Sequence, residues 1–119
     1  MESIIELTSE YEKVIKESDR PVIVIIIASW CGSCQIMAPI LEKVAFQYSG
    51  KIKFLMVDAE TNKEIAKKYG LDILPIILLF KEGNLVDRLM GTVSYNVLDG
   101  KMKSLLKVSS TNNISKIKR

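Results

Sequence analysis

The chain of 119 residues contains no histidine and only two cysteines. Histidine is the side chain most used as a general base near neutral pH and is the commonest metal ligand, so its absence excludes histidine triads and HExxH zinc sites. Two cysteines cannot supply the four thiolates of a structural zinc or iron–sulfur centre. We therefore expect no metal site held by this chain alone.

Long apolar runs are also absent. The two longest, residues 22–28 and 73–80, are far shorter than the roughly 18 residues that would cross a bilayer, and the second contains Pro75. The first residues are acidic, and they lack the basic start and apolar core of a signal peptide. We expect a cytoplasmic protein that does not enter a membrane.

The two ends of the chain differ in charge. Residues 1–20 carry six acids against three bases, whereas residues 100–119 carry six bases and no acid. A basic tail can bind an acidic partner or nucleic acid, but no aromatic side chain is interleaved here for base stacking. We predict a solvated helix face followed by a polar end, and no nucleic-acid binding.

The composition is that of one soluble globular domain, with 48% hydrophobic and 26% charged residues and a net charge of +3. At this length roughly two-thirds of the unfolded chain's surface can be buried, so a core can form without disulfide staples. We predict a single domain over residues 1–108 and a basic tail over residues 109–119.

Hydrophobic periodicity predicts four helices and four strands that alternate along most of the chain. Ser9-x-x-Glu12 and Thr61-x-x-Glu64 have the pattern of capping boxes, and Gly70 follows the third helix where a left-handed C-cap is expected. The expected helices span residues 11–20, 35–48 with Pro39 inside, 61–69 and 97–106, and the expected strands span residues 22–28, 52–57, 76–80 and 85–90.

The strand at residues 22–28 is uniformly apolar, which is typical of a central strand covered on both faces. A whole helix separates it from the next strand, so these two strands should be parallel. The short link at residues 81–84 forces the last two strands into an antiparallel hairpin. The pattern predicts an α/β fold with a central mixed sheet and helices on both faces.

The only two thiols, Cys31 and Cys34, lie between the predicted central strand and the helix that follows it. Unpaired backbone N–H groups and the helix dipole stabilise an anion at a helix N-terminus, so we expect a lowered pKa for the Cys31 thiol. Cys31 would attack a substrate disulfide, and Cys34 would then attack the Cys31 sulfur and release the substrate. Gly32 and Ser33 supply the tight turn between them.

Three other interpretations of the two cysteines stay open at this point. A zinc half-site would need two further ligands from another chain. A purely structural disulfide would stabilise little, because closing a four-residue loop contributes only about 2 kcal/mol in the chain-entropy model. Two unreactive buried thiols are the third alternative.

Residues 28–34, Ala-Ser-Trp-Cys-Gly-Ser-Cys, resemble the active-site loop of the thioredoxin family. Residues 68–83, KYGLDILPIILLFKEG, are similar to the second signature of that family, and Pro39 and Gly91 match its helix proline and the glycine after its last strand. The likeness covers about residues 3–107. It implies the thioredoxin fold, protein-disulfide reduction, and a cis bond before Pro75 packed against the dithiol.

The resemblance also implies a role for each matching residue. Cys31 matches the attacking thiol and Cys34 the resolving thiol. The expected substrate-binding residues are Trp30, Gly32, Ser33, Leu74, Pro75, Ile76, Gly91 and Thr92. Trp30 has the alternative of an ordinary core aromatic, and Leu74 and Ile76 the alternative of core filling.

The partners implied by the resemblance are a thioredoxin reductase as electron donor and client proteins that contain disulfides. We expect a monomer that uses no cofactor besides its own Cys31–Cys34 disulfide.

Several positions depart from the family pattern. Ile25 stands where the family places a buried aspartate, and Phe54 stands where it places a lysine neighbour, so both members of a polar pair have become apolar. Ile27 replaces a customary tryptophan, Ile76 a threonine and Ser33 a proline. A dry core is expected, and Cys34 has no evident protein base.

The prediction is a thioredoxin-like protein-disulfide reductase. The rival from another class is a binding or scaffolding module of the same fold with little turnover, which the loss of the buried acid favours and the presence of both cysteines opposes. A specialised oxidase or isomerase tuned by Ser33 is a further alternative.

Overall fold

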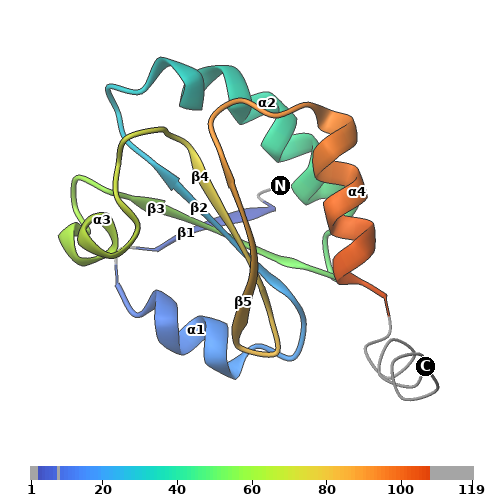
Figure 1. Ribbon diagram of the computed structural model, residues 1–119. Coiled ribbons are helices and arrows are strands. Elements are labelled where there is room, and N and C mark those ends of the chain that lie inside the picture. Colours follow the sequence, from blue (N-terminus) through green and yellow to red (C-terminus); the bar gives the residue numbers. More distant parts are fainter. Residues whose placement is uncertain (1–2, 8, 108–119) are drawn as a thin grey trace, which may run out of the picture.

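A computed structural model describes residues 3–7 and 9–107 of the chain (Figure 1). One sheet lies at the centre, and helices cover both of its faces. The elements in chain order are β1 (Ile4–Leu7), α1 (Tyr11–Glu17), β2 (Val22–Ile27), α2 (Gly32–Gln47), β3 (Lys53–Asp58), α3 (Lys63–Tyr69), β4 (Ile76–Lys81), β5 (Asn84–Met90) and α4 (Tyr95–Leu105).

The sheet has five strands in the order β1-β3-β2-β4-β5. The β3 strand is parallel to both β1 and β2, whereas β4 is antiparallel to β2 and to β5. The predicted mixed sheet with helices on both faces is therefore confirmed. The edge strand β1 was missing from the prediction, because its four residues are too few to show an alternating pattern beside the acidic residues around them.

The central strand β2 is buried on both faces, as its apolar sequence predicts. Val22, Val24 and Ile26 pack in one core cluster with residues of α1 and α3. Ile23 and Ile25 point the other way and pack with residues of α2 and α4. Successive side chains of a strand alternate between faces, so one strand supplies both cores.

The core is dry, as the apolar replacements predict. Among the residues that the structure describes, no charged side chain is buried, and tyrosine is the only polar type that is. Ile25 is fully buried and Phe54 is 2% exposed, and both lie in the cluster beneath α2 and α4. A single carboxylate placed there would have no charged partner.

Both predicted capping boxes are wrong. The α1 helix begins at Tyr11, one residue later than the box requires, and its N-cap residue Glu10 has a φ of 62° and no side-chain cap. The α3 helix begins after Asn62, and the Thr61 hydroxyl donates instead to the Asp58 carbonyl oxygen at 3.3 Å. Short hydroxyl side chains often bond locally in this way, which the motif alone cannot exclude.

The end of α3 also differs in detail from the expectation. Gly70 has the positive φ that was expected, 77°, but its ψ of 169° places it outside the left-handed helical region. Its N–H still donates to the Ala66 carbonyl oxygen at 2.8 Å. The helix therefore ends with an extended glycine instead of the predicted left-handed cap.

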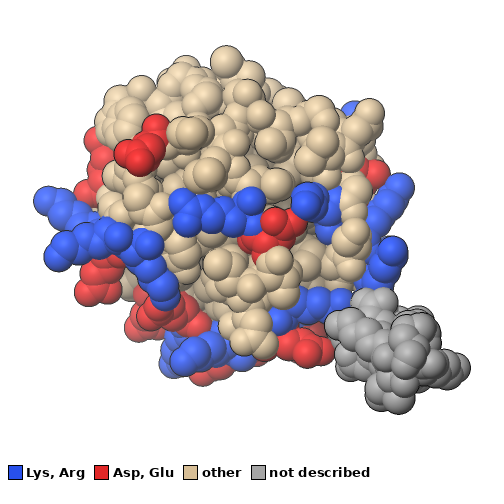
Figure 2. Space-filling view, in the orientation of Figure 1, with Lys and Arg blue, Asp and Glu red and all other residues tan. Residues whose placement is uncertain are grey.

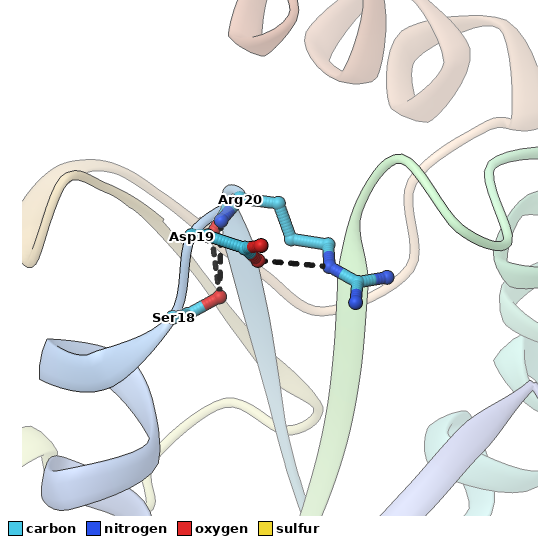
Figure 3. A network of polar contacts seen from close by, with 3 residues as sticks. All are labelled: Ser18, Asp19 and Arg20. Atoms are coloured by element: carbon cyan, nitrogen blue, oxygen red, sulfur yellow. Dashed lines mark hydrogen bonds and ion pairs between the residues drawn. The ribbon is translucent and has the colours of Figure 1, made fainter.

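The α2 helix begins three residues earlier than predicted, at Gly32, and continues through Pro39. The hairpin between β4 and β5 is confirmed, with Lys81 paired to Asn84 and Glu82 and Gly83 both at positive φ. Two central residues with positive φ match the twist of the flanking strands. The turn between α1 and β2 is closed by Ser18, whose hydroxyl donates to the Arg20 carbonyl oxygen at 2.8 Å (Figure 3).

The predicted basic tail at residues 109–119 lies outside the described residues, and so does residue 108 at the predicted domain end. Within the described part of the chain, none of the helices combines the length and the apolar character needed to cross a membrane.

The α2 and α4 helices are joined by a polar contact at the edge of the core. The Tyr48 hydroxyl donates to Asp99 Oδ1 at 2.5 Å, and Lys103 Nζ lies 3.1 Å from Asp99 Oδ2. The hydrogen bond to Asp99, followed by burial, raises the pKa of Tyr48 to about 12, while the same bond and Lys103 lower the pKa of Asp99.

We predict that Tyr48→Phe lowers the free energy of unfolding by about 1 kcal/mol at neutral pH, because one partly buried hydrogen bond is lost. The folded-state pKa of Tyr48 lies above its ordinary value of 10.0, so the contribution is complete below pH 10 and is lost as the pH rises through about 12. Urea unfolding at a series of alkaline pH values measures this.

Tyr95→Phe is the matched control, because the Tyr95 hydroxyl also joins α4 to α2 but donates to the uncharged Gln47 side chain. The alkaline loss of stability should be smaller in Tyr48→Phe than in the wild type, and Tyr95→Phe controls for the loss of a tyrosine hydroxyl between the same helices at neutral pH. An equal alkaline loss in Tyr48→Phe and the wild type would contradict the assignment.

Candidate active site

Three loops meet beside the start of α2. They are the turn from β2 into α2, the segment that precedes β4, and the segment that joins β5 to α4. The Ser33 hydroxyl donates to the Leu74 carbonyl oxygen at 2.5 Å, and the Gly91 N–H donates to the Pro75 carbonyl oxygen at 2.9 Å. These two bonds tie the loops together around the cysteines.

Cys31 and Cys34 form a disulfide, with their Cα atoms 5.3 Å apart. Cys31 is the N-cap of α2, and its sulfur accepts the Cys34 N–H at 3.0 Å. The Ser33 hydroxyl lies 3.2 Å from the same sulfur. The Cys31 sulfur is therefore surrounded by hydrogen-bond donors at the positive end of a helix, where a thiolate is stabilised.

Cys34 has different surroundings. It lines a cavity of about 220 Å³ whose other walls are mostly apolar and include Ile25, Ile27 and Leu41. The carboxylate that lines this cavity belongs to Glu42, eight residues along α2 from Cys34, so the helical rise separates their Cα atoms by about 12 Å.

Exposure does not distinguish the two residues, since Cys31 is 5% exposed and Cys34 is 7% exposed, and both belong to the same apolar core cluster. The difference between them is that the Cys34 N–H and the Ser33 hydroxyl contact the Cys31 sulfur, whereas Cys34 lines the cavity.

Trp30 is 61% exposed, so it is not a core aromatic. The Leu74 and Ile76 side chains are 5% and 1% exposed and belong to the core cluster beneath α1 and α3, so both fill the core. Gly32 and Thr92 are exposed, whereas Pro75 and Gly91 are buried.

The Leu74–Pro75 bond is cis, as the resemblance implied. The cis bond lies directly before β4. Its carbonyl oxygen, that of Leu74, accepts the hydrogen bond from the Ser33 hydroxyl.

Two neighbours of the site were not foreseen. The Ser29 hydroxyl donates to a Glu60 carboxylate oxygen at 2.7 Å, across 31 positions of the sequence. The exposed Ile73 side chain lies against Gly91, where an added Cβ would come within 3.1 Å of Ile73 Cγ2. Neither contact has a local sequence signal, because each joins residues brought together only by the fold.

The surface around the cysteines carries little charge. Residues 29–41, 73–80 and 89–98, which supply the three loops, contain no charged residue. In Figure 2 the Lys, Arg, Asp and Glu side chains gather across the middle and lower part of the view, and few lie above, over the start of α2 and the loop before α4. This part of the surface is therefore suited to neutral or apolar contacts.

Comparison with known proteins decides the family. The sequence profile described as Thioredoxin matches residues 3–104. The chain belongs to the thioredoxin family. It is 38% identical over 90 residues to Thioredoxin 1 of Nostoc sp., which covers 76% of this chain and 84% of the relative.

Two further relatives agree with this. Thioredoxin of Pseudomonas aeruginosa is 36% identical over 98 residues, 82% of this chain and 91% of that protein. The chloroplastic Thioredoxin Y1 of Arabidopsis thaliana is 39% identical over 98 residues, and the chain spans 57% of its length.

The fold is also found in a solved structure from work on the thiol resolving mechanism in yeast mitochondrial 1-Cys peroxiredoxin via glutathione/thioredoxin systems. That structure is 28% identical and has a TM-score of 0.76, over 87% of this chain and 96% of the other.

Family membership and a CxxC pair joined as a disulfide identify the chain as a thiol–disulfide oxidoreductase. Its redox group is part of the polypeptide. Within residues 3–7 and 9–107, no cluster of three or more His, Cys, Asp or Glu side chains could hold a metal ion.

We predict that Gly91→Ala destabilises the protein by about 1–2 kcal/mol, because Gly91 has a φ of +77° and an added Cβ would lie 3.1 Å from Ile73 Cγ2. Gly100→Ala is the matched control, since Gly100 lies in α4 with nothing within 4 Å of the added Cβ. It should stabilise the protein by up to about 1 kcal/mol. Urea unfolding that moved both variants in the same direction would contradict this.

Proposed function

We propose that the protein reduces disulfide bonds in client proteins, with Cys31 as the attacking thiol and Cys34 as the resolving thiol. The observation that carries this proposal is the asymmetry of the two sulfurs. The Cys31 sulfur is contacted by the Cys34 N–H and the Ser33 hydroxyl, whereas Cys34 faces an apolar cavity. A thiolate is favoured at the first position and disfavoured at the second.

The reaction follows from these surroundings. The Cys31 thiolate attacks one client sulfur, and the second client sulfur leaves as a thiolate. Cys34 then loses its proton and attacks the Cys31 sulfur, which restores the internal disulfide and releases the first client sulfur. Two electrons pass from the dithiol to the client.

The proton of Cys34 has few acceptors among the described side chains that line its cavity. Ile25 occupies the buried position there, and the carboxylate in the lining belongs to Glu42, whose Cα lies about 12 Å along the helix from that of Cys34. We propose that water or the departing client thiolate accepts this proton, which would make the resolving step slow.

The client would lie across the uncharged surface formed by the three loops. Trp30, Gly32 and Thr92 are exposed on these loops and would contact the client, whereas Pro75 and Gly91 are buried. Ser33 would contribute its hydroxyl, and Leu74 and Ile76 would support the surface from the core.

A reductase of the thioredoxin type is the proposed electron donor, and proteins with accessible disulfides are the proposed clients. No cofactor besides the internal disulfide is needed for this chemistry. We propose a monomer in the cytoplasm, where thiols are kept reduced, although the similar proteins include cyanobacterial and chloroplastic ones.

A second candidate, a binding module with little turnover, is favoured by one observation, the apolar Ile25 and Phe54 in place of a polar pair. Reduction of insulin disulfides with dithiothreitol as reductant separates the candidates. The proposed reductase accelerates the reaction and Cys31→Ser abolishes the acceleration, whereas no acceleration by the wild type would support the binding module.

We predict that limited iodoacetamide at neutral pH labels Cys31 of the reduced protein before Cys34, because its thiolate is the better stabilised. Peptide mass mapping locates the label. Cys34→Ser should also accumulate mixed disulfides with clients, because the resolving attack is lost. Preferential labelling of Cys34 would reverse the two roles.

We predict that Ile25→Asp accelerates the resolution of mixed disulfides by about tenfold or more, because a carboxyl with a raised pKa beside Cys34 can act as its base. The same change should lower the free energy of unfolding by roughly 3 kcal/mol, since it buries an unpaired polar group. Stopped-flow measurement of the resolving step gives the rate.

Ile23→Asp is the matched control. It is equally buried on the same face of β2, but lies two residues, or about 7 Å, farther from the cavity. It should lose stability without a gain in rate. A fast wild-type rate that Ile25→Asp does not improve would show that an internal base is unnecessary here.

A further inference from the structure

The Ser33 hydroxyl lies between two acceptors that belong to different parts of the site. Its oxygen is 2.5 Å from the Leu74 carbonyl oxygen and 3.2 Å from the Cys31 sulfur. A hydroxyl has one hydrogen, so it can donate to one of these acceptors at a time. The state of Cys31 therefore decides where that hydrogen goes.

In the oxidised protein the carbonyl is the better acceptor. The Cys31 sulfur is bonded to Cys34, carries no charge, and already accepts the Cys34 N–H. Neutral sulfur accepts hydrogen bonds weakly, whereas a carbonyl oxygen is a strong acceptor. The shorter distance to Leu74 agrees with donation to that oxygen.

In the reduced protein the Cys31 sulfur becomes the better acceptor. The Cys31 thiolate is a charged acceptor, and hydrogen bonds to ionised groups are about twice as strong as neutral ones. Because the Ser33 oxygen already contacts both acceptors in the oxidised protein, the hydroxyl can turn from one to the other by rotating its hydrogen.

The Leu74 carbonyl loses its donor in this rotation. The β4 ladder begins at Ile76, and the Pro75 carbonyl oxygen is taken by the Gly91 N–H. The Leu74 oxygen therefore lies just beyond the end of the sheet, with the Ser33 hydroxyl as its donor. When that donor turns away, a lone pair is free beside Cys31.

We propose that Ser33 is a positioning residue whose hydroxyl donates to Leu74 in the oxidised protein and to the Cys31 thiolate in the reduced protein. The inference rests on the proposed function of Cys31 as the attacking thiol. Ser33 then stabilises the thiolate before the Cys31–client bond forms and the client disulfide breaks. Its hydroxyl returns to Leu74 when Cys34 closes the internal disulfide and the client thiolate leaves.

The first test measures the pH dependence of Cys31 alkylation in the Cys34→Ser background, where Cys31 is the only thiol. Ser33→Ala should shift this profile to higher pH and slow alkylation at neutral pH by about tenfold, as loss of a hydrogen bond to a charged group requires. Ser33→Thr keeps the hydroxyl and should restore the wild-type profile. An unchanged profile in Ser33→Ala, or an equal shift in both variants, would overturn the proposal.

The second test observes the wild-type protein and so does not depend on the folding of a variant. Leu74–Pro75 is the only Leu-Pro pair in the chain, so leucine labelled at the carbonyl carbon and proline labelled at nitrogen give one unique resonance. The Leu74 carbonyl carbon should shift on reduction in the wild type, and this shift should be smaller in Ser33→Ala. If reduction does not change the chemical shift of the Leu74 carbonyl carbon, the proposal is overturned.

Neither test requires turnover or a client protein. A protein that reduces insulin but shows no Ser33 effect would therefore keep the proposed function and lose this inference. If Ser33→Ala changes the alkylation profile and the Leu74 resonance but the wild type does not reduce insulin, the change of hydrogen-bond partner is retained and its role in disulfide reduction is rejected.

Discussion

The β2 strand pairs with β3 on one edge and β4 on the other, and helices cover both of its faces. A strand so enclosed has no freedom to slip, because a shift of one residue would exchange the side chains of the two cores. The chain leaves this strand at a fixed point and enters α2 after four residues. The position of Cys31 at the helix N-cap is thus set by the packing of β2, in a core cluster that includes both cysteines.

The dryness of the core has a cost and a benefit. Replacing a buried charged pair by well-packed apolar residues is often neutral or stabilising, because no ion has to be removed from water. Ile25 and Phe54 therefore fit the fold well. The same replacement leaves Cys34 beside apolar side chains, and the polar contacts are made on the other side of the disulfide, where the Ser33 hydroxyl and the Cys34 N–H reach the Cys31 sulfur.

Much of the fold could be predicted because its signals are local and strong. Few structures are compatible with the uniformly apolar stretch of β2, with the helical spacing after Cys34, or with the short link before Asn84. The capping-box motifs are weaker signals, and they predicted the wrong helix starts. Ser9 and Thr61 are followed by glutamate at the right distance, yet neither caps a helix, since the choice depended on local turns that spacing does not encode. The short β1 strand gave too little pattern to recognise.

The site likewise contains residues that motifs predict and contacts that only the fold creates. The two cysteines, Pro75 and Trp30 were visible in motifs, and the exposure of Trp30 excludes its alternative as a core aromatic. The contacts of Ser33 with Leu74 and of Ser29 with Glu60 span 41 and 31 positions, so they exist only once the sheet has formed.

The three uncharged segments around Cys31 affect how a partner arrives. Charged surfaces attract or repel molecules over distances near the Debye length, about 8 Å at physiological ionic strength, and so raise or lower the frequency of encounters. The three segments carry no charge of their own, so they contribute to neither effect. Recognition at this surface is decided after contact, by shape, by release of water from apolar side chains and by backbone hydrogen bonds. Such recognition depends little on salt and tolerates partners of either charge.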